Sequence, residues 1–229
     1  MLAFFRSLAN AFELGTCWNC GCASVTATAL CSYCDEALPR WYPRCCQHLS
    51  DIEQHLTADQ KRCRYWYGAL RWEPQVQQLM TLFKFRNKAE LAPLLATQLA
   101  AHLRLCYQGQ PMPDCIVAVP MTQHAWSQRG FHQTALLARY LSAVLQVPYI
   151  AGGLRKIRSV PMQHMASQSA RWENSKRSQL ALHDFSGSTV AVVDDVLSTG
   201  ATMMAAADAL YKKGAAAVDA WAVVYNQHD

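Results

Sequence analysis

The stretch TVAVVDDVLSTGATMM, residues 189–204, decides the fold that this sequence predicts. Five apolar or small residues lead into two carboxylates, Asp194 and Asp195, and a short loop, residues 196–200, then opens a helix-like run over residues 201–212. This order predicts a buried parallel strand, a tight turn and a helix N-terminus. In an α/β sheet, such a turn is a place where anions bind.

The loop after the predicted strand suits a phosphate group. A helix start offers unpaired N–H groups and the positive end of the helix dipole. Hydroxyl side chains add further donors, and a glycine permits a turn with positive φ. The candidate phosphate-binding residues are Val196, Leu197, Ser198, Thr199, Gly200, Ala201 and Thr202.

The paired carboxylates Asp194 and Asp195 need a different partner, because they would repel the same phosphate. They suit hydroxyl groups, or a metal ion that bridges to the ligand. A ribose 5-phosphate would satisfy both halves, with its phosphate in the loop and its 2- and 3-hydroxyls on the aspartates. A plain strand–turn–helix with a capping Asp-Asp pair is the alternative interpretation.

Residues 192–202, VVDDVLSTGAT, resemble the 5-phosphoribosyl-1-pyrophosphate (PRPP) loop of type I phosphoribosyltransferases. The G-x-x-x-x-G-K-[ST] spacing of a Walker A loop is absent. The resemblance implies that the loop takes the 5-phosphate of PRPP, that the catalytic carboxylates Asp194 and Asp195 face the ribose hydroxyls, and that Mg²⁺ lies on the pyrophosphate side.

Length and composition fit a globular chain. The 229 residues suit one large domain, or one domain and a small module, and an apolar fraction of 52% supports a real core. A formal charge of +5 does not by itself imply nucleic acid as a partner. No apolar run reaches the roughly 18 residues that a transmembrane helix needs, so we expect no transmembrane segment.

The N-terminal run MLAFFRSLANAFELG is not a convincing signal peptide, because it lacks a basic start and is interrupted by Arg6 and Glu13. We therefore expect a cytoplasmic protein. Apolar residues recur in this run at helical spacing. They predict a short helix docked on the protein itself, with a membrane-surface or partner helix as the alternative.

Eight of the ten cysteines precede residue 64. Without a secretion signal disulfides are disfavoured, so this cluster predicts a metal site. Cys17-x-x-Cys20 and Cys31-x-x-Cys34 form two knuckles whose four thiolates make the tetrahedral shell that zinc prefers. A closed shell predicts a structural zinc, which would supply the folding energy of an N-terminal module, residues 1–63.

A second group of possible ligands follows in the sequence: Cys45, Cys46, His48, His55 and Cys63. Cys45-x-x-His48 has ligand spacing, but no complete second pair follows it. Unpaired cysteines and surface histidines are the simpler interpretation, and a second metal site stays open.

Residues 64–229 alternate between strand and helix patterns. Strands are expected at 64–72, 115–119, 148–151, 189–195 and 217–225, helices after Pro74 and over 91–105, 131–145 and 201–212, and a loop over 121–130. Alternation of this kind predicts a parallel sheet with crossover helices, an α/β fold.

A long, poorly patterned stretch, residues 154–177, carries six basic residues and one acid, a net charge of +5 that equals the formal charge of the whole chain. Such a stretch can be a solvated mobile loop without a further role, a lid over the phosphate site, or a track for a polyphosphate backbone. Trp172 and the aromatic run at residues 65–67 could stack on bases, although aromatic residues are more often part of a core.

Several stretches, in order along the chain, resemble the ComF family, whose enterobacterial representatives are called GntX. They are the four-cysteine finger, the run LFKF at residues 82–85, Val119-Pro120 followed by RGFHQ at residues 129–133, a pattern of Gln163, Arg171 and Asn174, and VVDDVLSTGAT. The match spans nearly the whole chain, and the combination is specific.

The family resemblance implies a type I phosphoribosyltransferase-like fold with a zinc finger in place of the base-recognising hood. It also implies a role in natural transformation or in the use of imported DNA, with single-stranded DNA as a partner. A pyrophosphate loop is expected at Pro120, Arg129 and Gly130. A mobile basic loop is expected at Arg155, Lys156, Arg158, Gln163, Arg171 and Asn174.

The sequence departs from the family pattern at two places. His132 stands where Asn is usual, which affects any polar contact made there. Fewer Cys-x-x-Cys pairs follow the first finger than is usual.

Three functions are compatible with these observations. The first is a PRPP-binding protein that also binds single-stranded DNA and has little or no transferase turnover. The second is an active phosphoribosyltransferase with a nucleobase or amido acceptor, for which the sequence offers no identifiable acceptor site. The third is a zinc-dependent adaptor that docks on a DNA-uptake helicase or translocation protein.

Overall fold

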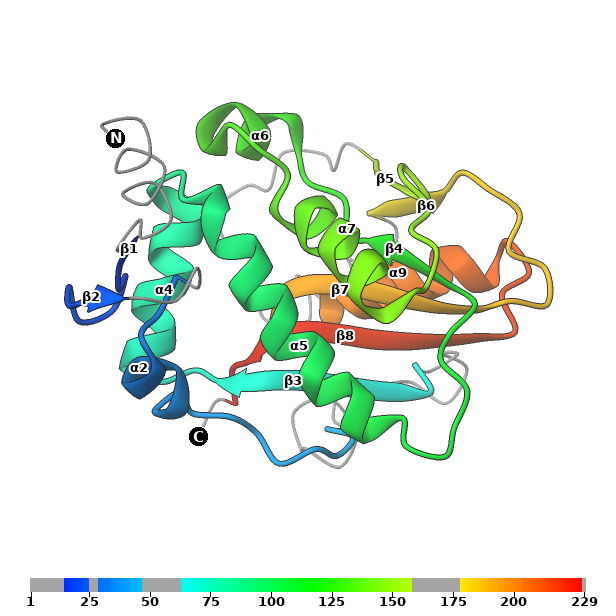
Figure 1. Cartoon of the computed structure of the whole chain (residues 1–229). Helices are drawn as coiled ribbons and strands as arrows, with labels where there is room; N and C mark the ends of the chain where they lie inside the picture. Colours follow the sequence, from blue (N-terminus) through cyan, green and yellow to red (C-terminus); the bar gives the residue numbers. More distant parts are fainter. Residues whose placement is uncertain (1–14, 25–28, 47–62, 158–177, 228–229) are drawn as a thin grey trace, which may run out of the picture.

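The computed structural model describes residues 15–24, 29–46, 63–157 and 178–227 (Figure 1). Within these ranges, four parallel strands form the central sheet, in the order β3-β8-β7-β4. The strands are β3 (Tyr65–Arg71), β4 (Cys115–Ala118), β7 (Thr189–Leu197) and β8 (Ala217–Tyr225). The two central strands are largely buried, which explains why their sequences are nearly continuous apolar runs.

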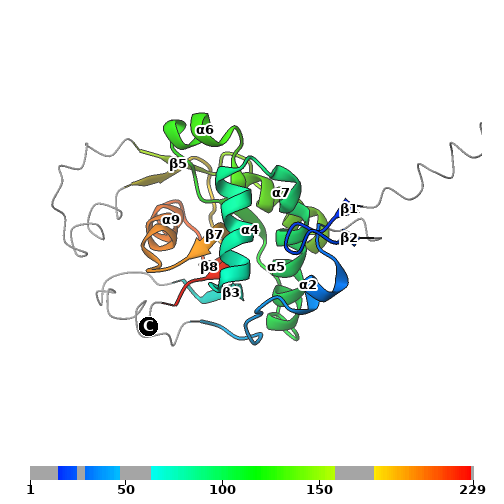
Figure 2. The same cartoon turned by 90° about the vertical axis from the view of Figure 1, so that its left-hand side faces the viewer.

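Helices cover both faces of the sheet (Figure 2). One face carries α4 (Pro74–Phe85), α5 (Ala92–Cys106), which follows the short helix η1 (Ala89–Leu91), and α7 (Gln133–Leu145); the other carries α9 (Ala201–Tyr211). Strand β7 serves both layers, because Val193 packs with α5 and α7 whereas Val192 packs with α9. The alternation of side chains along one strand thus produces two apolar layers.

A small N-terminal module packs beside α4 and α5. It contains β1 (Gly15–Thr16), the antiparallel partner β2 (Ala23–Ser24) and α2 (Ser32–Glu36). Leu30 and Leu38 are buried in the same core as α4 and α5. Asp35 Oδ1 also accepts a hydrogen bond from Gln98 Nε2 of α5 at 2.7 Å. The module is therefore joined to the sheet domain by apolar and polar contacts, and a domain boundary near residue 63 stays a prediction.

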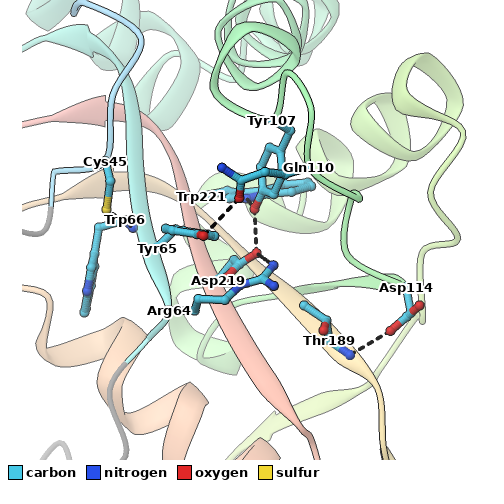
Figure 3. Close-up of polar contacts among 10 residues, drawn as sticks. All are labelled: Cys45, Arg64, Tyr65, Trp66, Tyr107, Gln110, Asp114, Thr189, Asp219 and Trp221. Carbon is cyan, nitrogen blue, oxygen red and sulfur yellow. Dashed lines mark hydrogen bonds and ion pairs between the residues drawn. The ribbon is translucent and has the colours of Figure 1, made fainter.

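A buried ion pair lies at the amino ends of the strands (Figure 3). Asp219 of β8 is fully buried, and its two oxygens accept from the Arg64 guanidinium at 2.9 and 2.6 Å. The Tyr107 hydroxyl donates to the same carboxylate at 2.5 Å, and burial raises the pKa of Tyr107. Because ligands of parallel sheets bind at the carboxyl ends of the strands, this network has a structural role.

Strands and helices form at most of the predicted places, with small shifts of their ends. The loop predicted over residues 121–130 was wrong, because it contains helix α6 (Gln123–Arg129). Thr122 caps this helix by accepting the Ala125 N–H at 3.1 Å. Gly130, with φ of +75°, ends it in the left-handed conformation.

Two other local predictions were also wrong. The strand expected at residues 148–151 forms only a single bridge, in which Tyr149 lies parallel to Ile116 of β4. The loop expected to begin at Val196 begins later, because Val196 and Leu197 still pair with Val224 and Tyr225 of β8. The pairing with a long neighbouring strand extends β7 beyond its carboxylates.

The basic stretch expected over residues 154–177 starts in regular structure. Residues Leu154–Lys156 form β5, which pairs antiparallel with β6 (Gln179–Ala181). In Figure 1 this pair lies above β4, an edge strand of the main sheet. None of the described helices combines the length and the apolar character needed to cross a membrane.

Candidate functional site

The turn between β7 and α9 has the geometry of an anion site. Strand β7 ends at Leu197 and α9 begins at Ala201, so Ser198, Thr199 and Gly200 form the turn. Gly200 has φ of +74°, a conformation that is strained for residues with a Cβ. Among the described residues, no side chain caps the N-terminus of α9. Hydroxyls and helix N–H groups therefore meet at the carboxyl edge of the sheet, where they can bind a phosphate.

Asp194 and Asp195 follow the buried run of residues 190–193 in β7, and as neighbours in a strand they point to opposite faces of the sheet. Asp195 reaches α4, where its Oδ1 lies 2.7 Å from Lys84 Nζ. Asp194 Oδ1 accepts the N–H of Asp195 at 2.8 Å. Burial, followed by the charge of Asp195, raises the pKa of Asp194 to about 7. One carboxylate is thus charge-paired, and the other can hold a proton near neutral pH.

Lys84 is a site residue that sequence reasoning did not assign, although it lies in the family-like run at residues 82–85. It occupies the last turn of α4, and its ammonium group is the charged partner of Asp195. Its carbonyl oxygen accepts from Gln133 Nε2 at 3.5 Å, and Gln133 Oε1 accepts from Arg129 Nη1 at 2.9 Å. These contacts bring three separate family-like motifs together beside the turn.

His132, which stands where the resembled family usually has Asn, makes polar contacts with two backbone segments. It is the N-cap of α7, and its Nδ1 lies 3.2 Å from the Ala135 N–H. Its Nε2 lies 3.2 Å from the Met121 N–H in the loop after β4, so in either tautomer the single acceptor nitrogen of the neutral ring faces a backbone N–H. Burial lowers the pKa of His132 and so favours the neutral imidazole that can accept such a hydrogen bond.

A cleft of about 700 Å³ opens beside the turn, and its lining includes Pro120 and Gly130 of the predicted pyrophosphate loop. Arg155 and Lys156, predicted for the basic loop, also line it. Arg129 does not, because its guanidinium lies over the Phe85 ring at 5.5 Å and bonds Gln133. The remaining predicted residues of the basic loop, Arg158, Gln163, Arg171 and Asn174, lie outside the described residues.

The four predicted metal ligands, Cys17, Cys20, Cys31 and Cys34, come together, with all four Sγ atoms within 4.8 Å of one another. The Sγ atoms of Cys20 and Cys31 are 3.7 Å apart. Zn–S bonds of about 2.3 Å at tetrahedral angles would place sulfurs about 3.8 Å apart, so the cluster fits such an ion. The four cysteines could therefore hold a metal such as zinc.

The other sequence-based candidates are only partly described. His48, His55 and Trp172 lie outside the described residues, as does the N-terminal apolar run. Cys45 Sγ accepts the Trp66 N–H at 3.2 Å, while Cys46 and Cys63 are buried. In the part of the chain that the structure describes, only one possible metal cluster forms, made of Cys17, Cys20, Cys31 and Cys34.

Two of the three aromatic residues at positions 65–67 belong to the core, and the third, Tyr65, is partly buried against it. Trp66 and Tyr67 are buried at 1% and 3% exposure, and they pack on opposite faces of the sheet. The core interpretation of this run, which the sequence left open, is correct because β3 lies between two apolar layers.

Comparison with known proteins agrees with this geometry. Residues 130–229 match the phosphoribosyl transferase domain family. The DNA utilization protein YhgH of Escherichia coli is 30% identical over 219 residues, which cover 90% of this chain and 95% of that protein. Competence protein F of Haemophilus influenzae is 26% identical over 217 residues, covering 90% of this chain and 94% of that protein.

Solved structures of phosphoribosyltransferases also resemble the chain. A hypoxanthine phosphoribosyl transferase of Trypanosoma cruzi matches with a TM-score of 0.40 and 16% identity, covering 60% of this chain and 74% of that one. The match to YhgH, in contrast, extends over nearly the full length of both proteins. The chain therefore belongs to the ComF family, and it combines a type I phosphoribosyltransferase fold with a four-cysteine cluster near its N-terminus.

Proposed function

We propose that this protein binds PRPP, or a ribose 5-phosphate, at the turn between β7 and α9, binds single-stranded DNA, and acts in natural transformation or in the use of imported DNA. One observation carries the ribose-phosphate part. Two carboxylates directly precede a hydroxyl-bearing turn, in which Gly200 adopts a positive φ at the start of α9. The names of the relatives, DNA utilization protein and competence protein F, support the DNA part.

Each part of the ligand has a proposed partner. Asp194 and Asp195 would accept hydrogen bonds from the ribose 2- and 3-hydroxyls, and residues 198–202 would take the 5-phosphate. The loop after Pro120 would face the pyrophosphate, with Mg²⁺ between its phosphates. Lys84 would hold the Asp195 side chain in place. A structural zinc would occupy the four-cysteine cluster.

Binding of PRPP is the core of this proposal, and transfer is a separate question. Transfer would require an acceptor held against C1 of the ribose, together with stabilisation of an oxocarbenium-like transition state. The proposal therefore expects PRPP binding with little or no release of pyrophosphate in the presence of nucleobases or amines. Rapid PRPP-dependent release of pyrophosphate with one acceptor would instead identify the protein as an active transferase.

Calorimetric titration with Mg·PRPP tests the ribose-phosphate site. Asp195→Asn should weaken binding roughly 10- to 100-fold, because a charged acceptor contributes about 1.5–3 kcal/mol to a hydrogen bond. Asp184→Asn is the matched control, since Asp184 is exposed and precedes the amino end of β7, and it should bind like the wild type. Absence of binding to the wild type, or equal binding by Asp195→Asn, would contradict the proposal.

A further inference from the structure

The cleft beside the turn is lined by aromatic and basic side chains. Its walls come from the end of β4, from α6 and α7, and from β5, whereas Asp194, Asp195 and residues 198–202 do not line it. A ligand in this cleft would therefore lie next to the turn, on the side where the loop after Pro120 is proposed to face the pyrophosphate. Its volume of about 700 Å³ is in the usual range for a binding site of a small molecule or of one unit of a polymer.

The charge of the cleft is positive. Arg139 of α7 and Arg155 and Lys156 of β5 line it, and its lining contains no Asp or Glu. In the described part of the chain, none of these three cations forms an ion pair with a carboxylate. Three cations on a concave surface, of which Lys156 also acts electrostatically on Asp194, attract an anionic ligand. The cleft is therefore complementary to a molecule that carries phosphate groups.

The cleft also offers an oriented aromatic surface. Trp126 of α6 is 53% exposed, which is unusual for so large an apolar side chain. Its ring meets the His132 ring edge-on, with centroids 6.0 Å apart and an interplanar angle of 79°. The neighbouring Phe131 is packed against Phe83 at 5.5 Å. A ring that is both held in place and exposed is suited to stacking on a planar group.

We infer that this cleft holds one nucleotide of a single-stranded DNA, with its base stacked on Trp126 and the adjoining phosphates on Arg139, Arg155 and Lys156. The inference rests on the proposed function, because it localises the DNA that this function requires. A free phosphate would leave the aromatic wall unused, and a neutral aromatic ligand would leave the cations unpaired. A base inside a duplex is stacked on its neighbours, so the faces that Trp126 would contact are available only in a single strand.

Anisotropy of a labelled short oligothymidine, measured at several salt concentrations, tests this inference. Trp126→Ala should weaken binding roughly 5- to 150-fold, the range observed for loss of one stacked base, and Trp126→Phe should retain most of the affinity. Arg139→Gln should reduce the slope of log affinity against log salt by about 0.7, because one phosphate contact to a single strand is lost.

Two controls lie outside the cleft. Tyr140→Ala removes an exposed aromatic ring, which lies on α7. Lys212→Gln removes an exposed cation beyond the end of α9. Both variants should bind the oligonucleotide within about twofold of the wild type. Arg139→Gln and the two control variants should bind Mg·PRPP like the wild type, because their residues belong neither to the turn nor to the loop after Pro120.

The outcomes separate this inference from the proposed function. If the wild type binds the oligonucleotide and Trp126→Ala and Arg139→Gln bind it equally well, the DNA site lies elsewhere and only the inference fails. If the wild type binds no oligonucleotide, the DNA part of the proposed function fails as well, whereas the PRPP titration still decides the ribose-phosphate part. If duplex DNA competed with the labelled oligothymidine as strongly as single-stranded DNA does, the assignment of the cleft to a single strand would also be overturned.

Discussion

The ion pair between Lys84 and Asp195 joins the end of α4 to the end of β7, and only 18% and 10% of the two side chains are exposed. Loss of the lysine would leave a largely buried carboxylate without its partner. We expect Lys84→Gln to lower the free energy of unfolding by about 1–3 kcal/mol, less than for a fully buried pair because some solvent reaches the lysine. Urea denaturation measures this change.

The double variant Lys84→Gln/Asp195→Asn should recover most of that loss, since no buried charge is left unpaired. Lys212→Gln, which removes an exposed lysine, is the matched control and should change the free energy of unfolding by less than about 0.5 kcal/mol. If Lys84→Gln were as stable as the wild type, the pair would contribute nothing to the position of Asp195.

Asp194 should make the stability of the protein fall as the pH rises. Burial and the charge of Asp195 raise its pKa from 3.8 to about 7, so the folded protein retains a proton that the unfolded chain loses near pH 4. The free energy of unfolding should therefore fall between about pH 4 and pH 7. Asp194→Asn removes this charge and should be more stable than the wild type by about 1–3 kcal/mol at about pH 8.

The difference between Asp194→Asn and the wild type should nearly vanish at about pH 4.5, where the native Asp194 is protonated. Thermal or urea unfolding across this pH range provides the test. Parallel stability profiles for the two proteins would show that Asp194 titrates near its ordinary pKa.

Sequence reasoning at the scale of residues places side chains near one another where the signal is local. Asp194 and Asp195 lie in the last part of β7 and Gly200 in the turn that follows, so their order along the chain already brings them close together. Lys84 is far from them in the sequence, and its role depends on how α4 packs against the sheet. The sequence also did not predict that His132 caps α7, because Asn is the residue expected at such a position.

Helix α5 carries a histidine that is out of place in an apolar layer. His102 is 6% exposed and faces the ring of Tyr67, and its Nε2 has no hydrogen-bond partner among the described residues. Burial lowers its pKa to about 4. The unfolded chain therefore binds a proton near pH 6.5 that the folded protein takes up only near pH 4, so stability is lost as the pH falls through this range.

His102→Leu should remove this acid sensitivity. Between about pH 7.5 and pH 5, protonation of His102 should lower the free energy of unfolding of the wild type by about 2 kcal/mol. The free energy of unfolding of the variant should not show this contribution. At about pH 7.5 the variant should be as stable as the wild type or up to about 1 kcal/mol more stable, because an unsatisfied nitrogen is removed. His183→Leu, at an exposed position, is the control, and equal acid slopes for His102→Leu and the wild type would contradict the prediction.

Helices and strands are predicted well from the sequence where a buried apolar run forms them. They are predicted poorly where strand pairing or helix capping determines whether they form. The long apolar strands β7 and β8 and the amphipathic helix α7 form at the expected places. Helix α6 was missed although its signals, Thr122 before the helix and Gly130 after it, are present in the sequence. The bridge at Tyr149 depends on which residues of β4 are free to pair, and periodicity does not contain that information.

At the scale of the whole molecule, the N-terminal module and the sheet domain share one core. The module has only two-residue strands and a five-residue helix, which bury too little surface to be stable alone. It packs Leu30 and Leu38 into the core of α4 and α5, and Lys88 lies over the Trp18 ring at 4.4 Å. The sequence predicted the cysteine cluster from its spacing, whereas this docking depends on tertiary packing.

This shared core predicts that metal removal destabilises more than the module. Cys20→Ser, or treatment with a zinc chelator, should undock Leu30 and Leu38, whose burial contributes about 1.5–3 kcal/mol each. The midpoint of thermal unfolding should then fall by roughly 10 °C, with loss of one bound zinc per chain measured by elemental analysis.

Cys22→Ser is the matched control, because Cys22 is exposed and outside the cluster, and it should retain both zinc and melting temperature. Binding of Mg·PRPP should survive below the lowered melting temperature, since the turn between β7 and α9 contains no residue of the module. A melting temperature unchanged by metal removal would show that the module is held by its packing alone.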